Sequence, residues 1–320
     1  MLRKLFRGVS VLVAGALLAA CAGTTPTPAA PVTVRFAMLP ILDALPMFVA
    51  QEKGYFAAEG IDLQVVPVAS AAARDQLMQA GQGDAMVNDL ISTLFYNKDA
   101  TTLKVVRYAR TATSDFAQYF ILAGPGTGIT DAAGLKGVEI AISEATTIQY
   151  VTDRLLAAEG LTPDEIKTVA IPNIVDRMTA LANGTVPAAA MPDPAAAGAI
   201  ASGASIVVSD AAHPELGHSE LSFSAAFVAE HPEAVSGFLR AWEKAVADIN
   251  ADKTAWKSVL TANKLLSDQL IDTYTLPDYP TAAVPTEAQF RDVNDWAKAL
   301  GLIDKDLSYA DSVDASFLPK

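Results

Sequence analysis

The amino-acid sequence predicts an α/β protein with mainly parallel sheets flanked by helices. From residue 32 onward, short apolar segments with strand periodicity alternate with segments of helical periodicity, which is typical of βαβ units. The pattern also occurs twice, because "QLMQAGQGDAMVND" and "RMTALANGTVPAAAMPD" both follow the order helix, glycine, strand, acid. With 320 residues, of which 51% are hydrophobic, the chain can form one large domain or two lobes of ordinary size.

The first set of elements begins with the strand "VTVRFAML", whose alternate residues from Val32 to Met38 share one face. The segment "PMFVAQEKG" follows as a helix, with Pro46 in its first turn and Gly54 beyond its end. Strand "IDLQVVPVA", helix "ARDQLMQAG", strand "DAMVND", helix "LISTLFYNK" and strand "LKVVRYA" complete this set.

A second set of elements follows the segment "FAQYFILAGPGTG". The strand "LKGVEIAIS" leads into the helix "TTIQYVTDRLLAAEG", which a glycine closes. Thr162, Pro163 and Glu165 then form a capping box with proline at the first helical position. A further helix, "NIVDRMTALANG", and strands near residues 187–191 and 205–209 complete the second set.

The C-terminal part begins with "SELSFSAAFVAE", which we expect to be a strand that returns to the first set. A long amphipathic helix starts at His231 and Pro232, and its apolar face carries Val235, Phe238, Leu239, Trp242, Val246 and Ile249. The segment "PTEAQFRDVNDWAKALG" predicts another helix, with Phe290, Val293, Trp296 and Leu300 on one face. These helices should pack on the first set of elements.

Residues 1–20 are expected to be a cleaved signal peptide. Arg3, Lys4 and Arg7 precede an apolar run of about 12 residues, which is too short for the roughly 20 that a bilayer span needs. The run ends in "LAAC", which resembles the bacterial lipobox and implies that Cys21 is lipidated. The alternative is a buried cysteine in a core helix. Residues 21–31, rich in Ala, Thr and Pro, are expected to be a lipid-anchored linker.

The charge balance restricts the partners. The formal net charge is −13, and an acidic body of this kind repels nucleic acid and anionic membrane surfaces, so no nucleic-acid partner is expected. Most of this charge is explained by solubility alone. The best second candidate for a membrane span, residues 188–208, is interrupted by Pro192, Asp193 and Pro194.

Several segments together carry a family resemblance, namely "LPMFVAQEKGYFAAEGIDLQVV", "AAGLKGVEIAIS", "LTPDEIKTVAIP" and "LANGTVPAA". In this order they resemble the periplasmic solute-binding proteins of nitrate, sulfonate, taurine and thiamine-pyrimidine-precursor ABC importers, from about Val32 to the C-terminus. The resemblance implies a two-lobed Venus-flytrap fold of type II with crossovers near residues 116–124 and 211–222. Lobe 1 would comprise residues 32–118 and 222–320, and lobe 2 would comprise residues 119–221.

The same resemblance implies the setting of the protein. Its partners would be a small-molecule solute and the permease and ATPase subunits of an ABC importer. The protein would be a monomer on the extracytoplasmic face of the cell membrane, held there by the lipid on Cys21.

Ligands of open α/β sheets lie beyond the carboxyl ends of the strands, where loops and helix N-termini converge. These ends predict a set of ligand-binding residues: Leu42, Asp43, Asn88, Asp89, Tyr119, Ser143, Glu144, Thr146, Thr147, Tyr150 and Asp193. Each polar residue before a helix could instead be a helix cap. Phe116, Tyr119 and Tyr150 could stack on a flat ligand, but aromatic residues at such spacings are more often part of the core.

The charges at the strand ends point to a class of ligand. The acids Asp43, Asp89, Glu144 and Asp193 stand there against only one base, Arg110. Since an anion needs fixed donors, this set favours a neutral or amino-bearing ligand. We expect a nitrogen heterocycle such as a thiamine pyrimidine precursor or riboflavin, with a sulfonate, taurine or nitrate as the alternative.

The chain is not expected to be an enzyme. Eukaryotic pyrimidine-precursor synthases resemble this fold, but they use a cysteine-rich motif with a lysine that carries pyridoxal phosphate, and Cys21 is the only cysteine here. The segment "GPGTG" lacks the spacing of a dinucleotide-binding loop. The histidines His213, His218 and His231 do not match a metalloprotease pattern. We therefore expect no catalytic residue, no cofactor and no metal site.

Overall fold

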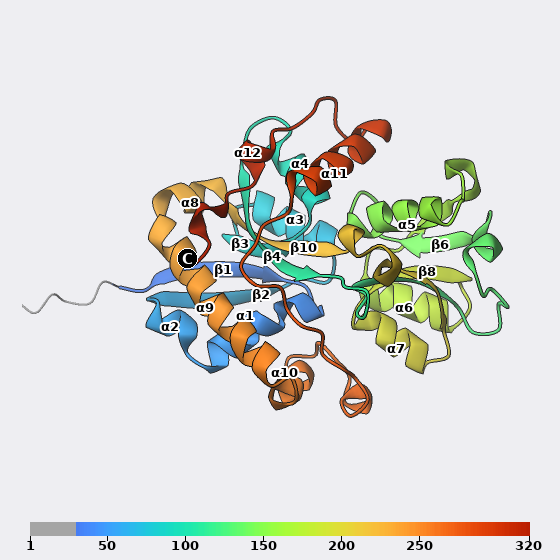
Figure 1. The fold of residues 1–320 in the computed structure, drawn as a ribbon, viewed down its shortest axis with the longest axis horizontal. Coiled ribbons are helices and arrows are strands. Elements are labelled where there is room, and N and C mark those ends of the chain that lie inside the picture. Colours follow the sequence, from blue (N-terminus) through green and yellow to red (C-terminus); the bar gives the residue numbers. More distant parts are fainter. Residues whose placement is uncertain (1–29) are drawn as a thin grey trace, which may run out of the picture. The chain divides into compact units, whose positions relative to one another are not determined.

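Two five-stranded sheets flanked by helices make up residues 30–320, the part of the chain that the computed structural model describes (Figure 1). The expected signal peptide, the lipidation site Cys21 and nearly all of the linker lie outside these residues. Among the helices described, none has the length and apolar character needed to cross a membrane.

The first sheet has the strand order β2-β1-β3-β10-β4. Neighbouring strands β2, β1 and β3 pair in parallel, whereas β10 lies antiparallel between β3 and β4. The five strands are β1 (Val32–Met38), β2 (Ile61–Pro67), β3 (Ala85–Asn88), β4 (Leu103–Thr111) and β10 (His218–Ser224).

The second sheet repeats this plan with the order β7-β6-β8-β5-β9. Strands β7, β6 and β8 are parallel, and β5 is the antiparallel strand next to the edge. Its strands are β5 (Tyr119–Ala123), β6 (Glu139–Ile142), β7 (Lys167–Ala170), β8 (Ala188–Pro192) and β9 (Ser205–Ser209). The predicted α/β class with two mainly parallel sheets is confirmed, and each sheet contains one antiparallel strand.

The chain passes between the sheets twice, through residues 112–118 and 210–217. Strand β10 returns to the first sheet as predicted, but it begins at His218, ahead of the boundary expected at residue 222. The second half of "SELSFSAAFVAE" is a helix rather than a strand. The Ser224 side chain accepts a hydrogen bond from the Phe227 N–H at 3.2 Å, which starts α8 (Ala225–Glu230).

The helices of the first lobe are α1 (Leu45–Glu52), α2 (Tyr55–Ala58), α3 (Ala71–Gln79), α4 (Leu90–Asn97), α8, α9 (Pro232–Ala251) and α10 (Lys257–Ala262). All six predicted apolar residues of α9 are buried. Phe238 stacks on Phe36 of β1 with ring centroids 5.7 Å apart and on Trp242 at 5.9 Å. The long helix therefore holds the aromatic centre of the first core.

The second lobe contains α5 (Thr147–Ala158), α6 (Ile174–Ala182) and α7 (Ala195–Ala201). Asn173 begins α6 as predicted, because its side chain accepts the Val175 N–H at 2.9 Å. The capping box of Thr162 and Glu165 is present, but it opens only a 3-10 turn, Pro163–Glu165. The predicted helix does not continue, because Lys167–Ala170 form strand β7, which pairs with β6 at the edge of the second sheet.

Helix α11 (Glu287–Ala299), followed by the short α12 (Tyr309–Ser312), lies against both lobes (Figure 1). It packs on α4, and Trp296 contacts Tyr150 of α5 with ring centroids 5.5 Å apart. Phe290, Val293 and Trp296 are buried as predicted, whereas Leu300 lies beyond the helix end and is 48% exposed. Helix α11 therefore contacts the first lobe, as expected, and also α5 of the second lobe.

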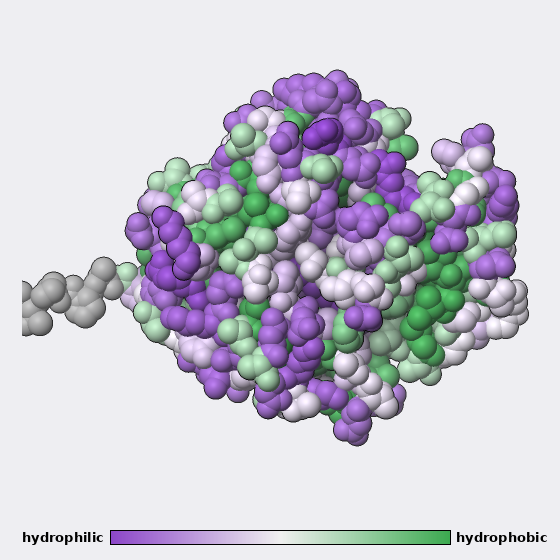
Figure 2. Space-filling view, viewed as in Figure 1, coloured by the Kyte–Doolittle hydropathy of each residue, from purple (hydrophilic) through white to green (hydrophobic). Residues whose placement is uncertain are grey.

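Hydrophilic and apolar surface are mixed on the face of the body in Figure 2, with apolar patches over parts of both lobes. The hydrophilic part agrees with the excess of acids in the sequence, which keeps the surface charged.

Candidate ligand-binding site

A cavity lies where the carboxyl ends of the parallel strands of both sheets meet. Its empty volume is about 560 Å³, counting the solvent space at its mouth. Most of the predicted site residues line it: Asp43, Asn88, Asp89, Tyr119, Ser143, Thr146 and Thr147. Leu39, Ile41, Ile148 and Ile174 add apolar surface.

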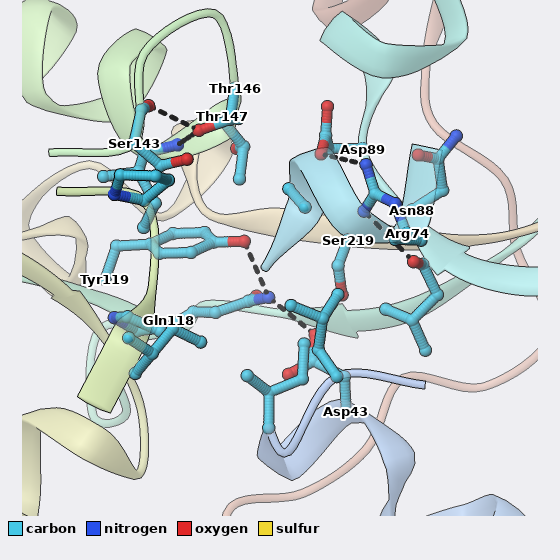
Figure 3. Close-up of a pocket in the computed structure, with 18 of the residues that line it drawn as sticks. Asp43, Arg74, Asn88, Asp89, Gln118, Tyr119, Ser143, Thr146, Thr147 and Ser219 are labelled. Carbon is cyan, nitrogen blue, oxygen red and sulfur yellow. Dashed lines mark hydrogen bonds and ion pairs between the residues drawn. The ribbon is translucent and has the colours of Figure 1, made fainter. Parts of the chain in front are cut away.

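Asp43 is the central acid of the first-lobe wall (Figure 3). It follows β1 in a 3-10 turn, where it caps no helix. Its carboxylate accepts hydrogen bonds from the Gln118 amide at 2.9 Å and from the Ser219 hydroxyl. Burial raises the pKa of Asp43, while the charge of Arg110 opposes this effect.

Asn88 and Asp89 follow β3. Asp89 is a helix cap, because one carboxylate oxygen accepts the Ser92 N–H at 2.8 Å and the other accepts Arg74 at 3.3 Å. The Thr93 hydroxyl donates its proton to the Asp89 carbonyl at 3.0 Å, so it must accept from the Asn88 amide nitrogen, which lies 2.9 Å away. This fixes the orientation of the Asn88 amide. The amide oxygen of Asn88 is buried and has no partner among residues 30–320.

The second-lobe wall is built around the N-terminus of α5. Thr146 caps this helix by accepting the Ile148 N–H at 3.2 Å, and its hydroxyl donates to the Ser143 carbonyl at 2.7 Å. Thr147 occupies the first helical position beside the cavity. Free N–H groups of the first turn and the helix dipole make this wall a region of hydrogen-bond donors.

The cavity is also lined by two arginines that were not predicted from the sequence, Arg74 of α3 and Arg177 of α6. Both are buried, and both come from helices rather than strand ends. Arg177 donates to the Ile171 carbonyl at 2.7 Å and has no carboxylate partner among the described residues. Burial lowers the pKa of Arg177 to about 10. A signal existed: Arg177 follows Ile174 by three positions, on the buried face of its helix.

Gln118 and Tyr119 come from the first crossover and the start of β5. Figure 3 shows the Gln118 side chain reaching across to Asp43, so it joins the crossover to the first-lobe wall. Its amide oxygen is buried without a partner within the described part of the chain. The Tyr119 hydroxyl lies 3.4 Å from the Gln118 amide nitrogen. Gln118 carries no sequence signal, because its contact is formed only in the fold.

Four predicted site residues do not line the cavity. Leu42 is core, and its carbonyl accepts the Tyr279 hydroxyl at 2.7 Å. Glu144 is exposed beyond the strand end.

Tyr150 points to α11, where its hydroxyl donates to Asp292 at 2.6 Å. The Asp193 carboxylate accepts hydrogen bonds from the Arg110 guanidinium at 3.0 Å and from the Tyr274 hydroxyl. The expected stacking by Tyr150 and contact by Asp193 are therefore replaced by structural contacts.

The two crossovers are joined beside the cavity. The buried carboxylate of Asp210 accepts the backbone N–H groups of Gln118 at 2.8 Å and Tyr119 at 3.1 Å. The Gly217 carbonyl accepts the Ala112 N–H at 2.6 Å, and a Cβ at Gly217 would lie 1.9 Å from the Asp210 carboxylate. Burial raises the pKa of Asp210 to about 7. This acid fixes the backbone that presents Gln118 and Tyr119.

The charge balance of the cavity differs from the one read at the strand ends. Arg110 does not line the cavity and is paired with Asp193, whereas Arg74 is paired with Asp75 and Asp89. Asp43 and Arg177 are the remaining charges of the lining, and no ion pair joins them. No group of three His, Cys, Asp or Glu residues within residues 30–320 is placed to hold a metal ion. The arrangement is suited to hydrogen bonding and stacking.

Comparisons with known proteins place this site in context. A family model described as NMT1/THI5 like matches residues 42–254. The alkanesulfonate-binding protein SsuA from Xanthomonas axonopodis pv. citri, solved with MOPS, is 20% identical with a TM-score of 0.75, over 89% of this chain and 99% of that one. A ligand-binding component of an ABC-type import system from Staphylococcus aureus, solved with zinc, is 12% identical with a TM-score of 0.73, over 89% and 97%.

The desulfurization enzyme DSZB shares the fold as well, at 16% identity and a TM-score of 0.64 over 89% of this chain and 97% of that one. A comparison with curated proteins finds no sequence match. Similarity at these identities establishes the fold, and the family match covers more than half of the chain. The chain therefore belongs to the NMT1/THI5 like family and has the two-lobed fold of the periplasmic binding proteins.

Proposed function

We propose that the protein is the solute receptor of an ABC importer. The observation that carries this proposal is the cavity itself, which takes its walls from the carboxyl ends of both sheets and from a crossover. A solute that touches both walls stabilises the closed arrangement, since only that state contacts it from two sides. The names of the Xanthomonas and Staphylococcus neighbours give further support.

Closure would be a hinge motion about residues 112–118 and 210–217. The backbone bonds to Asp210 keep these crossovers together while the lobes move. The closed receptor would then deliver its solute to a membrane permease that a cytoplasmic ATPase drives. We further propose a monomer, exported by its signal peptide and anchored through Cys21.

The cargo that we propose is a small neutral or amino-bearing nitrogen heterocycle, such as a thiamine pyrimidine precursor or riboflavin. Asp43 and the unpartnered amide oxygens of Asn88 and Gln118 offer acceptors for ring or exocyclic N–H groups. The ring of Tyr119 and the apolar lining offer surface for a flat molecule.

A sulfonate, taurine or nitrate is the second candidate. Arg177 and the N-terminus of α5 favour it, because both present donors to the cavity. Against a purely anionic cargo stands Asp43, whose carboxylate would face the anion without a cation bonded to it.

An enzyme is less consistent with this site than a receptor. The only cysteine of the sequence, Cys21, lies outside the described residues, and the acids of the lining are engaged in caps or amide contacts. Because the desulfurization enzyme DSZB has a similar fold, the binding experiment also checks whether the solute is consumed.

Calorimetric titration with hydroxymethylpyrimidine, riboflavin, thiamine, taurine and nitrate tests the proposed cargo. We expect saturable binding of a pyrimidine or flavin, with the solute recovered unchanged afterwards. Binding of taurine or nitrate alone would rule out the heterocycle, and consumption of a bound solute would rule out a receptor.

A further inference from the structure

The first-lobe side of the cavity presents hydrogen-bond acceptors. The Gln118 amide nitrogen is committed to the Asp43 carboxylate at 2.9 Å, so its oxygen must be the free end. The Asn88 nitrogen is likewise committed to Thr93 and Ser222, which leaves its oxygen unpartnered. These two buried oxygens and Asp43 are chemically matched to one kind of group, an N–H donor on the solute.

The second-lobe side has the opposite character. Arg177 is 1% exposed, yet only backbone carbonyls accept hydrogen bonds from it, and its Nε has no partner within residues 30–320. The capped first turn of α5 contributes to the same wall with Thr146 and Thr147. A buried guanidinium without an acid is costly for folding. Such a group is expected where a ligand supplies the missing acceptor.

The cavity charges do not neutralise each other inside the protein. The other buried arginines near the site are paired with acids, Arg74 with Asp75 and Asp89, and Arg110 with Asp193. Asp43 is bonded to an amide and a hydroxyl, and Arg177 to carbonyl oxygens. The lining thus keeps one negative group on the first lobe and one positive group on the second.

We infer that the solute is amphoteric: an amino or amidine end binds to Asp43, Asn88 and Gln118, and an acidic end binds to Arg177 and the first turn of α5. This inference rests on the proposed receptor function and adds a second, acidic end to the amino-bearing cargo. It also assigns Arg177 as a specificity-determining residue. Each end of the solute contacts a different lobe, so a molecule that lacks either end leaves one wall unpaired.

Three matched probes test the inference: 4-amino-5-hydroxymethyl-2-methylpyrimidine, its phosphate monoester, and benzyl phosphate, which lacks the amino end. Their affinities are measured by calorimetry on the full chain and on the variants Arg177→Gln, Arg177→Lys and Asp43→Asn. Arg291→Gln is the matched control, because it removes the same charge from an exposed position of α11. The melting temperature of each unliganded variant shows that it is folded.

The phosphate monoester should bind the unaltered protein about ten-fold or more tightly than the parent pyrimidine. Arg177→Gln should abolish that advantage, Arg177→Lys should retain part of it, and Arg291→Gln should leave it unchanged. Asp43→Asn should weaken both amino probes. Equal binding of the parent and the ester, unaffected by Arg177→Gln, overturns the inference and leaves the receptor function standing. Binding of benzyl phosphate alone overturns the inference together with the proposed heterocyclic cargo. Binding of none of the three overturns the inference and the pyrimidine cargo, and the titration with riboflavin and thiamine then decides the proposed function.

Discussion

Replacing Asp210 by asparagine should remove a specific pH dependence from the stability of the protein. The carboxyl group is fully buried at the joined crossovers and accepts two backbone N–H groups. Burial raises its pKa from 3.8 to about 7 in the folded state. The folded chain therefore holds a proton that the unfolded chain has released, and stability falls as the pH rises from about 4 to about 7.

The two pKa values set the size of the effect. Between pH 5 and pH 8 the Asp210 contribution to the free energy of unfolding should fall by about 2.5 kcal/mol. Asp43 and Glu220 also have raised pKa values through burial, but they are present in both proteins. The quantity to compare is therefore the difference between the unaltered chain and Asp210→Asn at each pH.

Urea unfolding at pH 5, 6, 7 and 8 measures this difference by linear extrapolation. Asp304→Asn is the control, because this acid is exposed, and the control should follow the unaltered chain at every pH. The reasoning is refuted if Asp210→Asn retains the full slope of the unaltered chain, or if the Asp210 contribution grows with rising pH.

Further predictions concern the hinge, the core and the site. Gly217→Ala should cost about 1–3 kcal/mol of unfolding free energy, since its Cβ would overlap the Asp210 carboxylate and Ala112; urea unfolding that shows no loss would contradict this contact. Phe238→Ala should cost about 3–5 kcal/mol, because the ring is fully buried against Phe36 and Trp242, and the melting transition should shift accordingly. Asp43→Asn should weaken binding of hydroxymethylpyrimidine by about ten-fold or more while the fold persists; calorimetry with unchanged affinity would exclude Asp43 as a contact.

The sequence predicts the architecture well where the signal is local. The spacing of apolar residues along α9 identifies its buried face, and the alternation of strands and helices identifies both sheets. The antiparallel placement of β10 and the change from strand to helix at Ser224 depend on pairing and capping that the apolar pattern does not reveal. The capping box at Thr162 opens a single turn because β7 pairs with the second sheet immediately afterwards.

The site is predicted less completely, for reasons that lie in tertiary contacts. Strand ends are readable, so Asp43, Asn88 and Ser143 could be chosen from the sequence. Arg177 reaches the cavity from a helix, and Gln118 reaches it from a crossover. Their roles appear only once the lobes are assembled.

The contacts of two other strand-end residues also depend on distant parts of the chain. Tyr150 packs under α11, and Asp193 pairs with an arginine far away in the sequence. The sequence therefore predicts an excess of acids in the cavity, whereas the lining contains two acids, Asp43 and Asp89, and two arginines.

The most direct measurement is native mass spectrometry of the purified full chain, followed by release and identification of any bound solute. The receptor account predicts one amino-bearing solute per chain, released unchanged on denaturation and lost or strongly reduced in Asp43→Asn. An account based on this cavity is contradicted if Asp43→Asn retains the solute as fully as the unaltered chain. It is also contradicted if no solute is bound and none of the titrated heterocycles, sulfonates or nitrate raises the melting temperature.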